Sequence, residues 1–114
     1  MGDVILMPYK NDEIKTVNVT LDSTKITGGS IECKRRGNVA MVYFRGVTFS
    51  GNLSGFKLGS GFPKPILQCS IMFSSSSISR DEGAWLADNN DGLYVNISSP
   101  SVAHWAGITY VTSE

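Results

Sequence analysis

The chain is poor in the features that mark several protein classes. Its 114 residues include two cysteines and one histidine, and ten basic residues balance ten acidic ones. Zero formal charge argues against a nucleic-acid or anionic-membrane surface, because both kinds of surface need an excess of basic side chains. No apolar run approaches the roughly 18 residues of a membrane span, and the start lacks the basic segment of a signal peptide. We therefore expect no membrane insertion and no nucleic-acid partner.

Two cysteines are too few for a disulfide framework or for a structural zinc site. Cys33 and Cys69 each lie in a run of mixed apolar and polar residues, where a small buried thiol fits well. We expect both to be free and buried, and a disulfide is the alternative. The oxygen-rich 88–92 segment lacks EF-hand spacing and a closing glutamate, so it predicts a hairpin turn rather than a calcium site. No cofactor or metal is predicted.

What the chain has in quantity is β-type alternation interrupted by small residues. Hydrophobic residues make up 41% of it, and many of its 12 glycines lie at apparent turns. Residues 1–15 are expected to be an N-terminal extension, and residues 16–114 one domain. Strands are expected at 16–21, 30–34, 39–49, 66–73, 84–87, 93–97 and 104–112, with 56–65 as loop or strand edge. About eight strands without an amphipathic helix predict an all-β, jelly-roll-like antiparallel β-sandwich.

The strand expected at Val39–Phe49 is apolar on both faces. Strict alternation places Val39, Met41, Tyr43 and Val47 on one face and Ala40, Val42 and Phe44 on the other, with a bend expected at Gly46. One face meets the core of the domain, and the other needs a second covering. Another subunit is the covering we expect, and a long inserted loop is the alternative.

Aromatic residues in the last third of the chain are the best candidates for ligand contact; they are Trp85, Tyr94, Trp105 and Tyr110. Flat rings stack on the C–H face of sugars while neighbouring polar groups bind hydroxyls. Trp85 follows a polar segment that contains Arg80 and Asp81, and Trp105 adjoins His104. We therefore predict that Trp85, Arg80, Asp81, His104 and Trp105 bind saccharide, and core packing of the tryptophans is the alternative.

No arrangement of residues indicates catalysis. The single histidine has no demonstrable serine or acid partner, and the G-x-S-x-G motif is absent from the sequence. His104 as a packed or solvated strand residue competes with its predicted role in binding. We expect a protein that is not an enzyme.

From Ser30 to Glu114 the order of motifs resembles the C-terminal trimeric jelly-roll domains of tail-fibre and baseplate receptor-binding proteins of tailed phages and prophages. The matching motifs are the hairpin Arg36-Gly37-Asn38-Val39, then Leu58-Gly59, Phe62-Pro63 and Pro65, then Asp91-Gly92-Leu93-Tyr94-Val95, then a Trp-containing last strand that ends at Tyr110. The resemblance implies a homotrimer in the virion tail. It also implies a saccharide of the bacterial cell surface as the ligand.

Two other functions remain open. One is a carbohydrate-binding module of a bacterial surface enzyme, which would be a monomer. The other is a structural baseplate or decoration domain without a ligand. The oligomeric state and the presence or absence of saccharide binding distinguish these functions from a trimeric receptor-binding domain.

Overall fold

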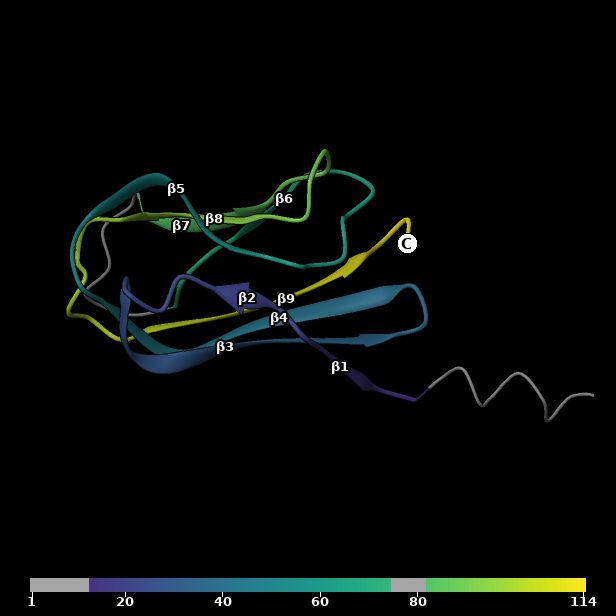
Figure 1. Cartoon of the computed structure of the whole chain (residues 1–114), viewed down its shortest axis with the longest axis horizontal. Coiled ribbons are helices and arrows are strands. Elements are labelled where there is room, and N and C mark those ends of the chain that lie inside the picture. Colours follow the sequence, from purple (N-terminus) through teal and green to yellow (C-terminus); the bar gives the residue numbers. More distant parts are fainter. Residues whose placement is uncertain (1–12, 75–81) are drawn as a thin grey trace, which may run out of the picture.

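Two antiparallel sheets face each other across one apolar core (Figure 1). The computed structural model describes residues 13–74 and 82–114, and in these it has nine strands and no helix. The strands are β1 (Lys15–Val17), β2 (Thr20–Leu21), β3 (Ile26–Arg36), β4 (Val39–Phe49), β5 (Leu53–Ser60), β6 (Cys69–Ile71), β7 (Gly83–Leu86), β8 (Leu93–Ile97) and β9 (His104–Val111). The strand orders are β1-β3-β4-β9 and β2-β5-β8-β7-β6. The predicted all-β sandwich is confirmed.

The core is built by alternation along the strands. On β8, Leu93, Val95 and Ile97 are buried and the residues between them are half-buried. Opposite them, Val42 and Phe44 of β4 are fully buried. These side chains come from both sheets and form a single cluster, so the inner faces of the two sheets pack directly on each other.

The strand at Val39–Phe49 has the predicted bounds but not the predicted faces. The pairing of β4 with β9 shifts register between Phe44 and Val47, and Gly46 there has a φ of 61°. This β-bulge adds one residue, so Val47 turns inward with Val42 and Phe44 and is fully buried. The assignment of Val47 to the same face as Val39, Met41 and Tyr43 was wrong, whereas the bend expected at Gly46 is confirmed.

The single strand predicted at 16–21 is wrong. The chain instead leaves one sheet after β1, which pairs with β3, and enters the other at β2, which pairs with β5. Val17, Val19 and Leu21 nevertheless all pack against the core, because the chain crosses at the edge of the sandwich. The alternation of these three residues therefore predicted their burial correctly, but it did not predict that the strand is interrupted between β1 and β2.

Two further boundaries differ from prediction around the prolines. Residues 56–60 belong to β5, which lies between β2 and β8, rather than to a loop. Pro63 and Pro65 follow the end of this strand, as their missing N–H groups require. The strand predicted at 66–73 shrinks to β6, and Leu67, which lies outside β6, is 75% exposed.

The cysteines are free thiols in separate sheets. Cys33 on β3 is buried and Cys69 on β6 is half-buried. The Asp88–Gly92 segment connects the antiparallel pair β7 and β8, as expected for a hairpin turn. Within the described parts of the chain, no helix is long and apolar enough to cross a membrane.

Candidate functional site

The outer face of the five-stranded sheet carries a pair of stacked aromatic rings. Trp85 lies between the buried Ala84 and Leu86 on β7, so its side chain points away from the core. Tyr94 is its direct cross-strand partner on β8. The ring centroids lie 5.7 Å apart and the planes differ by 9°, and both residues are half-buried. The pair offers apolar surface on a face that water reaches.

Small and polar residues surround these rings. The cross-strand partner of Trp85 on the other side is the exposed Ser70 of β6. Lys57 of β5 lies opposite Tyr94, and the Tyr94 hydroxyl donates to Asn90 Oδ1 at 3.4 Å. The same Asn90 oxygen accepts a hydrogen bond from the Gly92 N–H at 2.7 Å. The turn between β7 and β8 therefore holds the polar end of the tyrosine.

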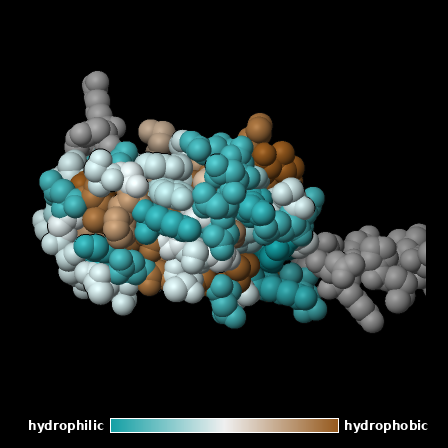
Figure 2. Space-filling view, turned by 45° about the horizontal axis from the view of Figure 1, so that its top comes forward, coloured by the Kyte–Doolittle hydropathy of each residue, from teal (hydrophilic) through white to brown (hydrophobic). Residues whose placement is uncertain are grey.

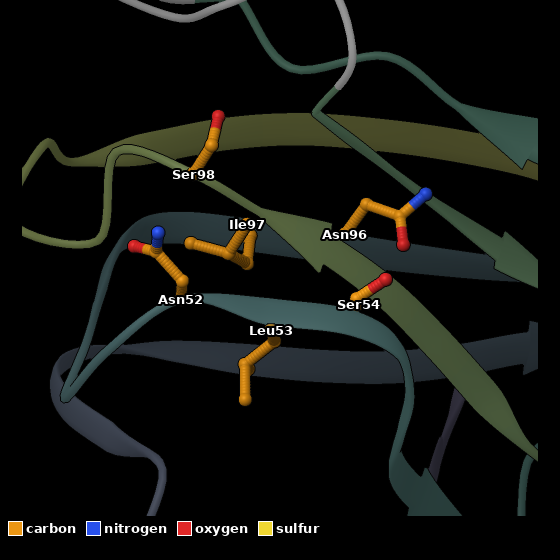
Figure 3. A pocket seen from close by; sticks show the side chains of 6 residues that line it. All are labelled: Asn52, Leu53, Ser54, Asn96, Ile97 and Ser98. Carbon is orange, nitrogen blue, oxygen red and sulfur yellow. The ribbon is translucent and has the colours of Figure 1, made fainter.

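A polar hollow of about 430 Å³ lies on the same sheet, where β5 and β8 meet near the ends of the strands (Figure 3). Four of its six lining residues carry a hydroxyl or an amide group; the residues are Asn52, Leu53, Ser54, Asn96, Ile97 and Ser98. In Figure 3 the Ser54 hydroxyl and the Asn96 amide project from neighbouring strands and Ser98 from the end of β8. These groups can donate to and accept from a ligand rich in hydroxyls.

A bulge on β5 creates this hollow. The register between β5 and β8 shifts between Leu53 and Phe56, and Gly55 has a φ of 54°. The Gly55 N–H donates to Asn96 Oδ1 at 2.6 Å, which fixes the orientation of the amide. The amide nitrogen of Asn96 is thereby left as a donor facing away from the bulge (Figure 3). The side-chain amide of Asn96 is therefore a preorganised hydrogen-bonding group.

The aromatic pair and Asn96 of the hollow lie on the same face of the five-stranded sheet. Tyr94 and Asn96 lie two residues apart on β8 and therefore project from the same face, about 7 Å from each other along the strand. Gly83 is the cross-strand partner of Asn96, just as Trp85 is the cross-strand partner of Tyr94. Because Gly83 has no side chain, it leaves room beside both groups. We refer to this surface as the β5–β8–β7 face.

The predicted site residues do not gather in one place. Trp85 is part of the β5–β8–β7 face. Trp105 projects from β9, next to the inward-facing His104, and therefore lies on the outer face of the other sheet, where it is 52% exposed. Arg80 and Asp81 lie outside the described residues. The structure thus separates the two tryptophans that the sequence placed in one site.

His104 is enclosed rather than displayed. Its side chain is 0% exposed, and its Nδ1 lies 2.9 Å from the Val47 carbonyl oxygen. Nε2 lies 3.3 Å from Glu82 Oε1, and the rings of Phe49 and Phe73 pack edge-on against the imidazole. The imidazole does not reach the surface and is not part of the β5–β8–β7 face. Saccharide contact by His104 therefore stays a prediction.

Sequence reasoning missed the polar part of the face. Asn52, Ser54, Asn96 and Ser98 were not predicted to bind anything. For Asn96 a signal existed, because its position two residues after Tyr94 on an alternating strand places both on one face. For Asn52 and Ser54 there was none, because they come near Asn96 only through the pairing of β5 with β8.

The described side chains of this face support binding by stacking and hydrogen bonding. Lys57 adds one ammonium group near the aromatic pair. No group of three or more metal-ligating side chains occurs in residues 13–74 and 82–114. Comparisons with family models, with curated proteins and with solved structures find no match to this chain. Function is therefore inferred from the chemistry of the face itself.

Proposed function

We propose that this domain binds a saccharide of a bacterial cell surface, without catalysis, through the β5–β8–β7 face. We further propose that it does so as the receptor-binding domain of a phage or prophage tail, in line with the order of motifs in its sequence. The observation that carries the proposal is that the Trp85–Tyr94 ring pair and Asn96 of the hollow project from the same face of the sheet. Stacking surface and hydrogen-bonding groups are the two requirements of a sugar site.

The two halves of the face have different tasks in this proposal. The rings of Trp85 and Tyr94 contact the C–H surface of one sugar unit. The hydroxyl of Ser54 and the amide of Asn96 bind hydroxyl groups of the next unit, about 7 Å along β8. Lys57 accommodates an anionic substituent, such as a phosphate in a wall polymer. The expected ligand is therefore a saccharide of at least two units.

A homotrimer is the assembly we propose, and the outer face of the four-stranded sheet is its contact surface. The inward turn of Val47 leaves this face less apolar than the sequence suggested, but Tyr43, Trp105 and Val111 remain 36%, 52% and 45% exposed. Val39 and Met41 are half-buried beside them, and Val39 pairs with Val111 across β4 and β9. Covering these side chains with another subunit would remove them from water.

A trimer also compensates for weak sites. Shallow saccharide sites bind weakly one at a time, and three linked copies raise the apparent affinity by about 10²–10⁴ when their spacing matches the receptor.

In Figure 2 apolar side chains form separate groups among polar ones on the visible face. This mixed surface suits contact with a hydrated polymer better than docking of an apolar partner.

Binding of the fluorescently labelled protein to a glycan array, to Gram-positive cells and to purified wall polysaccharide tests the function. The variant Ser54→Ala removes one hydroxyl from the hollow. The matched control is Ser30→Ala, at an exposed position of β3. We expect binding by the parent, a several-fold loss for Ser54→Ala and no loss for Ser30→Ala. A protein that binds no glycan and no cell would be a structural domain instead.

Light scattering tests the assembly. We expect a trimeric mass for the parent and a monomeric mass for Met41→Asp, which places a charge on the outer face of β4. A monomeric parent that still binds saccharide would favour the carbohydrate-binding module of an enzyme over a tail domain.

A further inference from the structure

One group on the β5–β8–β7 face can act only as a hydrogen-bond donor. The Gly55 N–H donates to the Asn96 side chain at 2.6 Å, and a donor needs an oxygen as its partner, so this contact fixes which amide atom is Oδ1. The Nδ2 atom therefore lies on the other side of the amide, away from β5 (Figure 3). Within residues 13–74 and 82–114 the structure shows no acceptor for this nitrogen. Asn96 thus presents N–H groups to a ligand that carries an accepting oxygen.

Beside this donor the sheet carries no side chain. On the side of β8 opposite to β5 lies β7, and its residue in register with Asn96 is Gly83. A Cβ at Gly83 would lie 3.6 Å from the Ile71 carbonyl oxygen, which is an ordinary contact. Apart from the chain neighbours of Gly83, no other heavy atom of the described residues would lie within 4 Å of it. The outer face therefore has room for at least a methyl group at this position.

Apolar side chains border the space above Gly83. Trp85 lies two residues further along β7 and projects from the same face. Met72 directly follows β6, and the pairing of β6 with β7 continued by one residue would bring it opposite Gly83. Met72 is 86% exposed, and alternation from the buried Ile71 places it on the outer face. A small apolar group above Gly83 would therefore lie between an aromatic ring and a thioether.

A donor next to a space of methyl size matches the acetamido group of an amino sugar. Its carbonyl oxygen accepts a hydrogen bond, and its methyl group is attached to the same carbon atom. Neighbouring strands lie about 4.8 Å apart, so a hydrogen bond of about 2.9 Å from Asn96 brings the methyl group over Gly83. A sugar hydroxyl would also accept from Asn96, but it would leave the apolar space beside it to water.

We propose that the β5–β8–β7 face selects N-acetylated saccharides, with Asn96 binding the acetamido carbonyl oxygen and Gly83 admitting the methyl group. This inference rests on the proposed function, because it names the class of sugar bound at the same face. The acetamido group belongs to the sugar unit that lies over Asn96, next to the unit on the Trp85–Tyr94 rings. Ser54 remains available for a hydroxyl of that unit.

Paired sugars test the preference. N,N′-diacetylchitobiose and cellobiose share one backbone and differ only in acetamido against hydroxyl groups; N-acetylglucosamine with glucose and N-acetylgalactosamine with galactose are two further pairs. Each sugar is titrated into the ¹⁵N-labelled parent, and the amide shifts give its affinity. We expect the N-acetylated member of a pair to bind about tenfold more tightly, the factor expected of one hydrogen bond and one buried methyl group.

The outcomes separate this inference from the proposed function. Equal affinities within every pair that binds, or tighter binding of the sugar without the acetyl group, would overturn the selection of N-acetylated sugars and leave saccharide binding intact. A parent that binds no sugar of any pair, no cell and no wall polysaccharide would overturn both.

Two variants test the assigned residues. Asn96→Asp keeps an oxygen for the Gly55 N–H and removes the donor, and Gly83→Ala fills the space with a methyl group at ordinary contact distance. In each variant we expect the preference within a pair to fall from about tenfold to about twofold or less. Asn38→Asp adds the same charge at an exposed turn between β3 and β4 and should keep the preference of the parent. An unchanged preference in Asn96→Asp or in Gly83→Ala would overturn the role of that residue.

The parent alone supplies a readout that does not depend on the folding of a variant. The side-chain NH₂ signal of Asn96 should shift when the N-acetylated member of a pair binds, and shift less with the other member. An NH₂ signal that stays in place while the N-acetylated sugar is bound would overturn the assignment of the carbonyl oxygen to Asn96.

Discussion

Replacement of Phe44 and of its neighbour Tyr43 by alanine tests which face of β4 meets the core. Phe44 is 1% exposed, and its ring packs edge-on against Phe73 with centroids 5.1 Å apart. Truncation to alanine leaves a cavity and costs about 3–5 kcal/mol, out of a total stability of roughly 5–15 kcal/mol for a domain. Near the midpoint of thermal unfolding, about 4 kcal/mol corresponds to a fall in Tm of roughly 20 °C.

Tyr43 is 36% exposed on the opposite face, where its ring lies over Gly107. Loss of this cross-strand contact costs about 1 kcal/mol or less within one subunit. Urea unfolding at two protein concentrations measures both variants. In a trimer the unfolding midpoint depends on protein concentration, so each variant is compared with the parent at the same concentration. Equal losses of stability for both variants, or a larger loss of stability for Tyr43→Ala at high concentration, would refute the assignment of faces. If Phe44→Ala does not fold, Phe44→Leu replaces it.

Three more predictions concern single features of the fold. Gly46→Ala should lower the free energy of unfolding by about 1–3 kcal/mol, because Gly46 has a φ of 61° and a Cβ there would lie 3.0 Å from the Trp105 ring. The control is Gly51→Ala, where a Cβ meets open space and the change should be under about 0.5 kcal/mol. Urea unfolding measures both variants. Burial raises the pKa of the Cys33 thiol to about 11 and also raises that of Cys69, so a thiol reagent should label the folded protein slowly at pH 8 and label two thiols quickly in urea. No reactive thiol in urea would indicate a disulfide. Because the pKa of Glu82 is lowered from 4.5, its stabilising contribution is complete above that value and is lost as pH falls through the folded pKa, so acid should destabilise the parent more than Glu82→Gln; equal acid sensitivity in the two proteins would contradict this.

Strong local alternation made parts of the fold predictable. The bounds of β8 and the burial of Leu93, Val95 and Ile97 follow from an uninterrupted period of two. The bounds of β4 follow in the same way. The bulge at Gly46 changes the face of every later residue in that strand, and a pattern read with strict alternation cannot include it. Val47 was misassigned for this reason.

The candidate site depends on contacts between distant segments, which sequence patterns do not contain. Aromatic and polar residues were predicted to cluster in the last third of the chain, and Trp85 does contribute to the face. Its partner Tyr94 follows from the register of β7 with β8, and the hollow follows from the bulge between β5 and β8. The proximity of Trp105 to His104 in sequence suggested a shared role, yet neighbours on a strand point to opposite sides of the sheet.

The most direct test of the saccharide proposal compares the two tryptophans in one binding measurement. Trp85→Ala removes half of the stacked pair on the β5–β8–β7 face, whereas Trp105→Ala removes an exposed ring from the other sheet. Each is titrated with a wall polysaccharide that the parent binds, after circular dichroism and light scattering confirm its fold and mass. We expect Trp85→Ala to lose about tenfold in affinity, equivalent to the roughly 1–1.5 kcal/mol of an aromatic contact. Trp105 lies on the proposed trimer contact, so Trp105→Ala serves as the control only at a concentration where its mass equals that of the parent, and there we expect it to bind like the parent. Full binding by Trp85→Ala would contradict the assignment of the site to this face.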